Sequence, residues 1–208
     1  MPDGRSAVTE GPRGRHLVGL RAARTVWHRE PMVQQIEEVT VRVADASDAQ
    51  AIARVHVRSW QEAYVGILPA DYLESLDLEA RARRWEQDLR EGPQQHVRTW
   101  LAQAGSEVVG FLTLGPSRDE DAGRLDLEIY AVYLDPQRWG QGVARDLMRT
   151  VVGEVDRRAA ISLWVAAANE RARHFYRRNG FQADGTERYE TVGGIELLQV
   201  RYRRPGAH

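Results

Sequence analysis

The sequence predicts an α/β (α+β) fold in which a mixed β-sheet of about seven strands carries helices on both faces. Three observations lead to this prediction. An apolar run at residues 125–134 passes through a turn into a helix-periodic run at 143–155. A second apolar run at 160–165 is followed by a helical pattern at 169–179. The last segment, 181–203, has the two strand-like halves of a β-hairpin.

The first half of the chain supplies one strand and several helical segments. Alternation predicts a strand at 39–43, and Ser47-Asp48-Ala49-Gln50 has the form of a capping box with Gln at the third helical position. The following residues then share one helical face: Ile52, Val55, His56, Ser59, Trp60, Ala63 and Tyr64. Gly66-Ile67-Leu68-Pro69 ends this helix, and residues 71–76 and 78–90 predict one or two further helical pieces.

The second half supplies the remaining strands. Strands near 96–102 and 107–114 precede the run at 125–134, and the hairpin at 181–203 turns at Gly193-Gly194. The complete order is β-α-α-β-β-β-α-β-α-β-β. We find no internal repeat and expect no second domain.

The turn behind residues 125–134 is the most informative segment. It reads Leu-Asp-Pro-Gln-Arg-Trp-Gly-Gln-Gly-Val-Ala over residues 134–144. Backbone N–H groups at a helix start have no partner inside the helix, and the helix dipole adds partial positive charge. Glycine also lets a ligand approach the backbone closely. The turn is therefore either an ordinary helix start or a site for a pyrophosphate. It lacks the ending of a Walker A loop and the third glycine of a dinucleotide fingerprint.

A second segment, residues 169–181, also follows a predicted strand. Asn169 suits a helix N-cap, and Asn179-Gly180 suits the C-terminal stop of the same helix. Ala172, Phe175 and Tyr176 have the spacing of residues on one face of this helix.

Together, the two segments resemble the GNAT superfamily of acyl-CoA-dependent N-acyltransferases. The first is similar to the family's Arg/Gln-x-x-Gly-x-Gly/Ala signature: Gly142 and Ala144 occupy its last two marked positions, whereas Trp139 stands where the family has Arg or Gln. The second resembles Asn-x-x-Ala-x-x-Phe-Tyr-x-x-x-Gly-Phe at every marked position, namely Asn169, Ala172, Phe175, Tyr176, Gly180 and Phe181. The resemblance covers roughly residues 39–204.

The resemblance implies the GNAT fold over residues 37–205 and acetyl-CoA as co-substrate. In that fold acyl-CoA lies in the wedge between two splayed strands, and pantetheine pairs with free backbone groups of the first of them. The residues that the resemblance implies for coenzyme binding are Val132, Leu134, Trp139, Gly140, Gln141, Gly142, Val143, Ala144, Asn169, Ala172 and Phe175.

Direct attack of a primary amine on acetyl-CoA needs one base and one acid. The resemblance implies that Tyr176 is the acid that protonates the leaving thiolate, although helical spacing alone equally fits a core tyrosine. Glu128, on the polar face of its strand, is the candidate base, and Asp126 is the runner-up. Glu128 also fits an exposed position or an anchor for the substrate ammonium.

Trp60 and Tyr64 are the candidate substrate-binding residues. They begin a Trp-x-x-x-Tyr-x-Gly-Ile-Leu-Pro segment that resembles a stretch of many small bacterial GNAT proteins, where it lines the acceptor pocket. Aromatic walls suit a cationic amine through cation–π attraction, or an apolar acceptor, and such residues also occur as plain core. The expected acceptor is a small-molecule or peptide amine.

Composition narrows the classes of function. The formal net charge of −1 gives no general case for nucleic acid or an anionic membrane as partner. The absence of cysteine excludes an acyl-cysteine intermediate, and the histidine spacing predicts no metal site. All 29 basic residues are arginine, which excludes a lysine base. A non-catalytic acyl-CoA sensor and a transferase for longer acyl chains remain as alternatives.

Residues 1–36 are rich in Arg and Gly, and we expect them to form a disordered N-terminal extension. They lack the apolar core of a secretory signal, and no apolar run reaches the roughly 18 residues of a membrane span. We therefore expect a cytoplasmic protein. Because many GNAT proteins dimerise, the resemblance leaves a homodimer open.

Overall fold

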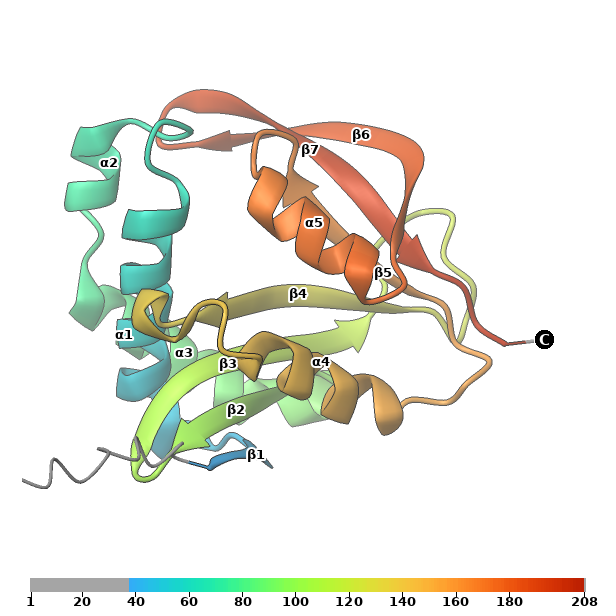
Figure 1. Ribbon diagram of the computed structural model, residues 1–208, viewed down its shortest axis with the longest axis horizontal. Coiled ribbons are helices and arrows are strands. Elements are labelled where there is room, and N and C mark those ends of the chain that lie inside the picture. Colours follow the sequence, from blue (N-terminus) through green and yellow to red (C-terminus); the bar gives the residue numbers. More distant parts are fainter. Residues whose placement is uncertain (1–37, 208) are drawn as a thin grey trace, which may run out of the picture. The chain divides into compact units, whose positions relative to one another are not determined.

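Seven strands form one mixed sheet in the order β1-β2-β3-β4-β5-β7-β6 in the computed structural model, which describes residues 38–207 (Figure 1). The strands are β1 (Val39–Val43), β2 (Arg98–Ala104), β3 (Glu107–Pro116), β4 (Leu127–Leu134), β5 (Ile161–Ala166), β6 (Gln182–Val192) and β7 (Ile195–Arg204). The helices are α1 (Ala49–Ala63), α2 (Ala70–Glu74), α3 (Leu78–Glu91), α4 (Val143–Gly153) and α5 (Glu170–Arg178). The prediction for residues 1–36 lies outside the described residues.

This element order confirms the predicted mixed sheet with helices on both faces. The region between β1 and β2 contains two further helical pieces, α2 and α3, so the chain has one short helix more than the predicted order. The final hairpin turns at Gly193 and Gly194 as expected, and both glycines have positive φ angles of 59° and 80°. Within the described residues, no helix combines the length and apolar character needed to cross a membrane.

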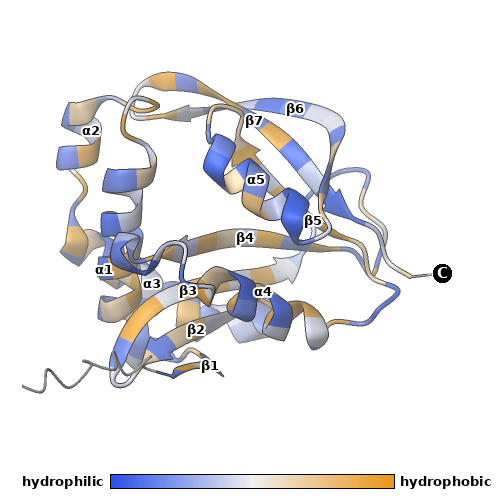
Figure 2. Cartoon of the chain, viewed as in Figure 1, coloured by the Kyte–Doolittle hydropathy of each residue, from blue (hydrophilic) through white to orange (hydrophobic). Residues whose placement is uncertain are grey.

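Two apolar cores lie on opposite faces of the sheet. On one face α4 packs against the strands through Leu147, Met148 and Val151, all at most 2% exposed. On the other face α1 and α3 cover the sheet, and this core is formed by Ala49, Ile52, Ala53, Val55, Ala82, Trp85, Leu101 and Phe111. β4 is apolar along most of its length because it contributes to both cores (Figure 2). Burial of these side chains on two faces fixes β4 in the middle of the molecule.

β4 is also the strand at which the sheet divides. It pairs in parallel with β5 over only three residue pairs, from Leu127–Ile161 to Ile129–Leu163. On its other edge the register with β3 shifts between Ile129 and Ala131, so Tyr130 is an extra, bulged residue. A bulge bends a strand and increases its twist. Beyond the bulge, β4 and β5 separate, and α5 lies beside the resulting gap (Figure 1).

The capping box lies two residues earlier than the sequence predicts. The Ser47 N–H donates to Asp45 Oδ1 (2.8 Å), and the Asp45 N–H donates to Asp48 Oδ2 (2.9 Å). Asp48 is held in place by Arg42, whose Nη2 lies 2.6 Å from Asp48 Oδ1. Because this carboxylate is fixed beside the start of the first helical turn, it takes the reciprocal role that we expected of Gln50.

His56 lies in the core between α1 and α3, with 8% of its surface exposed. Trp85 Nε1 donates to His56 Nδ1 (3.1 Å), and the imidazole stacks on Tyr133 with 4.7 Å between ring centroids. Since Nδ1 accepts a hydrogen bond, the imidazole is neutral and carries its proton on Nε2. Burial, assisted by the positive charge of Arg81, lowers the pKa of His56 to about 3.

This buried histidine makes the stability of the fold sensitive to acid. A histidine whose folded pKa lies below its unfolded value of about 6.5 stabilises the fold above that pH and loses the contribution as the pH falls. Between pH 7 and pH 5 we expect His56 to lower the free energy of unfolding by about 2 kcal/mol.

Urea unfolding at pH 7, 6 and 5 tests this expectation. His56→Gln, which keeps an acceptor for Trp85 but does not titrate, should be less sensitive to pH than the wild type. His174→Gln, at an exposed position on α5, should follow the wild type. Parallel losses in the wild type and His56→Gln would contradict the assignment.

Candidate functional site

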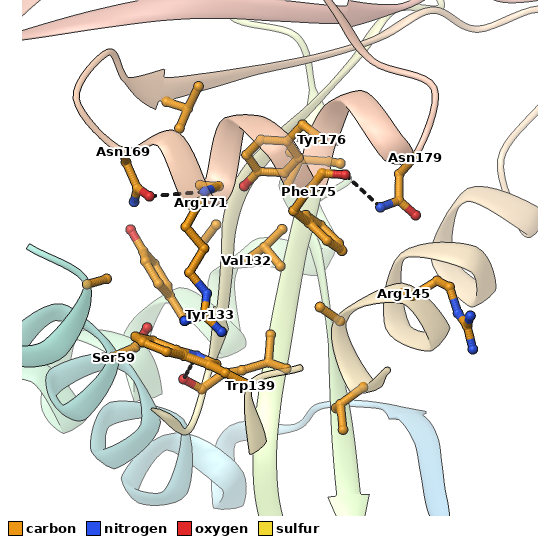
Figure 3. Close-up of a pocket in the computed structure, with 18 of the residues that line it drawn as sticks. Ser59, Val132, Tyr133, Trp139, Arg145, Asn169, Arg171, Phe175, Tyr176 and Asn179 are labelled. Atoms are coloured by element: carbon orange, nitrogen blue, oxygen red, sulfur yellow. Dashed lines mark hydrogen bonds between the residues drawn. The ribbon is translucent and has the colours of Figure 1, made fainter. Parts of the chain in front are cut away.

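A cleft of about 540 Å³ opens where β4 and β5 separate. Its walls come from the end of α1, from β4, from the turn before α4, from β5 and from α5 (Figure 3). Twelve of the fifteen predicted site residues line it: Tyr64, Val132, Leu134, Trp139, Gly140, Gly142, Val143, Ala144, Asn169, Ala172, Phe175 and Tyr176. The other three, Trp60, Gln141 and Glu128, do not line this cleft.

The edge of β4 that faces the cleft lacks a β5 partner beyond Ile129. Backbone groups on such an edge need hydrogen-bond partners, so they favour an extended ligand at this position. The carbonyl of Leu134 is already engaged, because it accepts a hydrogen bond from Trp139 Nε1 (3.2 Å). The region around Val132 therefore remains as the open edge, whereas the Leu134 carbonyl is not free in this structure.

The turn between β4 and α4 forms a backbone cradle, which comprises residues 140–144. Gly140 and Gly142 have φ angles of 77° and 91°, in the left-handed region that glycine adopts without strain. Gly142 is the N-cap of α4 and has no side-chain cap. The Asp146 N–H donates to the Gly142 carbonyl (3.0 Å), so the N–H groups that precede Asp146 are left out of the helical ladder. They give the cradle its capacity for an anion.

Side-chain contacts fix the segment of chain that leads into the cradle. Asp135 is buried, its Oδ1 accepts from the Gln137 N–H (3.0 Å), and its Oδ2 lies 2.5 Å from Arg58 Nη1 of α1. Gln141 turns away from the cleft, because its Nε2 donates to the Gln137 carbonyl (2.7 Å). Gln141 thus keeps only its backbone available to a ligand.

The second predicted motif forms the opposite wall. Asn169 Oδ1 accepts from the Ala172 N–H (3.0 Å), which confirms that Asn169 caps α5. Ala172 and Phe175 line the cleft. Asn179 Nδ2 donates to the Phe175 carbonyl (2.8 Å), and Gly180 follows with a φ angle of 86°, so α5 ends where the sequence predicts (Figure 3).

Three tyrosines from three elements meet at the cleft: Tyr64 at the end of α1, Tyr133 on β4 and Tyr176 on α5. Burial raises the pKa of Tyr176, and the neighbouring Tyr133 adds to the effect. The pKa of Tyr64 is raised chiefly by Tyr133, and burial raises the pKa of Tyr133 itself. All three phenols therefore keep their protons at neutral pH and can donate hydrogen bonds.

Trp60 lies next to this tyrosine group and not on the cleft wall. Its indole ring packs 5.0 Å from the ring of Tyr64, 6.3 Å from that of Tyr133 and 6.5 Å from that of Tyr72. Of the two aromatic residues in the Trp-x-x-x-Tyr pattern, Tyr64 therefore lines the cleft, whereas Trp60 packs against the neighbouring tyrosine rings.

Glu128 is 2% exposed, so an exposed position, one of its expected alternatives, is wrong. Arg118 binds its carboxylate from two sides: Nε lies 3.0 Å from Oε2, and Nη2 lies 2.6 Å from Oε1. The Arg118 N–H donates to Oε2 as well (3.1 Å). The runner-up, Asp126, is engaged too, with its Oδ2 2.8 Å from Arg203 Nη2. Both candidate bases are therefore paired in this structure.

The β3–β4 loop that carries Arg118 is fixed by a buried cation, Arg201 of β7. Arg201 Nη1 and Nη2 lie 2.6 and 2.8 Å from the two carboxylate oxygens of Asp121. Arg201 Nη1 also lies 3.3 Å from Asp119, which accepts from Trp164 Nε1 (2.9 Å) on β5. Hydrogen bonds from Arg201 to carboxylates, Asp121 first, raise its pKa further. This network ties the loop to the strands beyond the cleft.

Comparison with known proteins identifies the family of the chain. Residues 56–181, more than half of the chain, match the model of the acetyltransferase (GNAT) family. The chain belongs to the GNAT acetyltransferase family. The matched range begins on α1 and ends directly behind α5, so it contains every predicted GNAT site residue.

Individual relatives are similar over different lengths. The uncharacterized N-acetyltransferase YuaI of Bacillus subtilis is 40% identical over 111 residues, which cover 53% of this chain and 60% of YuaI. The probable N-acetyltransferase Rv2775 of Mycobacterium tuberculosis is 29% identical over 170 residues, which cover 79% of this chain and 92% of Rv2775. The structure of the PaiA N-acetyltransferase of Thermoplasma acidophilum in complex with coenzyme A has a TM-score of 0.63 at 19% identity. The superposition covers 81% of this chain and 99% of that one, and it shows the shared GNAT fold.

Sequence reasoning missed several GNAT cleft residues. The sequence did not predict Tyr133, because the bulge at Tyr130 changes which side chains of β4 face the cleft. A bulge leaves no clear signal in the sequence. Ser59 and Arg171 also line the cleft. For Ser59, the sequence did offer a signal, because this residue lies on the helical face that the sequence predicts for α1. Among residues 38–207, no group of histidine and acidic side chains is arranged to hold a metal ion.

Proposed function

We propose that the protein transfers the acetyl group of acetyl-CoA to a primary amine of a small molecule or peptide. One observation carries the proposal: a single cleft brings together the cradle, the open edge of β4 and the Tyr176 side chain. A pyrophosphate, an extended pantetheine arm and a thioester need these three features in this combination. The similarly folded PaiA structure contains coenzyme A, which supports the same ligand here.

In this proposal the coenzyme is held mainly by backbone. The free N–H groups of residues 140–144 bind the pyrophosphate, and the β4 edge around Val132 pairs with the pantetheine. Phe175 and Ala172 cover its apolar side from α5. Because Trp139 Nε1 donates a hydrogen bond to the Leu134 carbonyl, we propose that pantetheine pairs with β4 only in the Val132 region.

Tyr176 acts in this proposal on the leaving group. A thiol resembling cysteine has a pKa of about 8.5, so a departing thiolate accumulates charge that a donor must stabilise. The raised pKa of Tyr176 guarantees a protonated phenol at the cleft. Its hydrogen bond to the sulfur strengthens as the carbon–sulfur bond breaks. When the proton passes to the thiolate, the phenolate regains one through solvent, which balances the proton that the attacking amine gives up.

Glu128 is the proposed base. An alkyl amine has a pKa of about 10.4 and must lose a proton to attack the thioester. Because Arg118 occupies both oxygens of the Glu128 carboxylate, the pair must open before Glu128 takes a proton directly or through water. In the proposed mechanism Arg118 therefore controls when the Glu128 carboxylate is free to act.

The base assignment can be tested by the pH dependence of kcat/KM for a primary amine. Glu128→Gln should lower kcat/KM about 10²-fold and remove the acid limb of the profile. The exposed Glu187→Gln serves as the control. A Glu128→Gln profile with the wild-type shape would exclude Glu128 as the base.

If Tyr176 is the acid, its removal should change kcat and leave coenzyme affinity unchanged. Tyr176→Phe should lower kcat about 10²-fold while the affinity for acetyl-CoA stays within about two-fold, since only the hydroxyl is lost. Tyr202→Phe is a matched control, because Tyr202 is buried, its hydroxyl accepts from Arg173 and Arg177, and it does not line the cleft. A wild-type kcat in Tyr176→Phe would remove Tyr176 as the acid.

The coenzyme site is tested by calorimetric titration with acetyl-CoA. We expect wild-type binding and a loss of at least about ten-fold in Gly142→Ala, because the new methyl group stands at the cradle. Gly185→Ala is the control: its φ of 86° matches the 91° of Gly142, and neither added Cβ meets an atom closer than 3.7 Å. Each substitution costs about 1 kcal/mol of backbone strain, so only a loss specific to Gly142→Ala supports the cradle.

Two other outcomes contradict parts of the proposal. No acetyl-CoA binding by the wild type would refute the acyl-CoA site itself. Binding without transfer to any primary amine in a broad screen would favour the non-catalytic sensor over the transferase.

A further inference from the structure

Trp139 is the point at which this chain departs from the GNAT signature, which has Arg or Gln there. The structure shows the indole anchored at the entrance of the cleft. Its Nε1 donates to the Leu134 carbonyl (3.2 Å), and its ring packs against the main core. An anchored indole offers a fixed aromatic face but no positive charge, so position 139 itself supplies no cation, although Arg145 of α4 also lines the cleft.

A cation reaches this face from the opposite wall. Arg171, in the first turn of α5, extends across the cleft and places its guanidinium carbon 4.1 Å from the centre of the Trp139 ring (Figure 3). Tryptophan is the side chain on which a guanidinium stacks best. Both side chains line the same cleft as Gly140 and Gly142, so the stacked guanidinium and the cradle face one common space.

Arg171 is otherwise uncommitted. Within residues 38–207, no carboxylate lies within ion-pair distance of it, whereas its neighbour Arg173 pairs with Glu170. A positive charge in the first turn of a helix opposes the helix dipole, so the position does not serve the stability of α5. A guanidinium with no carboxylate partner among the described residues, in the same cleft as a backbone anion site, is matched instead to an anionic ligand.

We propose that Arg171 binds the coenzyme pyrophosphate and that Trp139 is the platform that holds its guanidinium over the cradle. The inference rests on the proposed function and deepens it. A guanidinium presents paired N–H donors that match two phosphate oxygens, and stacking on an indole leaves those donors free in the ring plane. The charge that an arginine of the GNAT signature would place at position 139 is supplied here from α5.

This arrangement also accounts for the identity of residue 139. An arginine at that position would place a second guanidinium against Arg171, and the two cations would repel each other. Trp139 removes the repulsion and replaces it with a stacking surface. Arg171 thus provides the positive charge, and Trp139 provides the aromatic surface on which the guanidinium stacks.

The test compares two probes that differ in the pyrophosphate, acetyl-CoA and acetylpantetheine, by calorimetry. Arg171→Ala should weaken acetyl-CoA binding about 10- to 100-fold, the range for loss of a charged hydrogen bond, and leave acetylpantetheine within about two-fold. Arg177→Ala, on the same helix but outside the cleft wall, is the matched control and should bind both probes as the wild type does.

A rescue variant separates a missing charge from a disturbed structure. Trp139→Arg should recover most of the lost acetyl-CoA affinity when it is combined with Arg171→Ala, because it returns the guanidinium to the turn. The same substitution in the wild-type background should not increase affinity, since it removes the platform and sets two cations together. Melting temperatures of all variants are measured to confirm that each one is folded.

Three outcomes would overturn the inference. Unchanged acetyl-CoA affinity in Arg171→Ala, with a wild type that binds, refutes Arg171 alone and leaves the proposed function standing. Equal losses for both probes would show that Arg171 shapes the cleft without contacting the pyrophosphate. A wild type that does not bind acetyl-CoA refutes the proposed function, and the pyrophosphate role of Arg171 fails with it.

Discussion

The separation of β4 from β5 is the constraint on which the rest of the site depends. Two parallel strands that pair over three residues and then part leave backbone donors and acceptors without partners in the middle of a domain. Such groups are tolerated only where a ligand, water or side chain can reach them. The bulge at Tyr130 bends the strand at the same point, and α4 and α5 flank the gap on either side. The cleft is thus a consequence of sheet geometry.

Around this opening, ion pairs fix the loops and apolar cores fix the sheet. Arg58 holds Asp135 ahead of the cradle, and Arg201 holds the β3–β4 loop through a group of aspartates. In each pair one partner is buried, so removal of the other partner leaves uncompensated charge, and the pairs set position more than they add free energy. An all-arginine set of cations suits this use, because each planar guanidinium can satisfy two carboxylate oxygens at once.

Sequence reasoning succeeded where the structure is locally encoded. The glycine turn, the Asn169 cap and the helix stop at Gly180 each depend on residues within a few positions of one another. It failed where distant segments decide the outcome. The pairing of Glu128 depends on how the preceding loop folds back, and Arg171 meets Trp139 only because two motifs 30 residues apart form opposite walls. The misplaced capping box is a local error instead, because Asp45 and Asp48 offer the same reciprocal pair two residues before Ser47 and Gln50.

The helix α1 touches both halves of the site, and this has a thermodynamic consequence. Its residue Arg58 holds the carboxylate in front of the cradle, while Ser59, one position later, and Tyr64, at its end, line the cleft. A shift of this helix would alter both surfaces together. If the cradle holds its proposed ligand, any free energy that this ligand contributes to fixing α1 equally favours a second ligand at Tyr64, because linkage between two ligands on one body is reciprocal. The Arg58–Asp135 pair and the end of α1 would then carry that coupling through one helix.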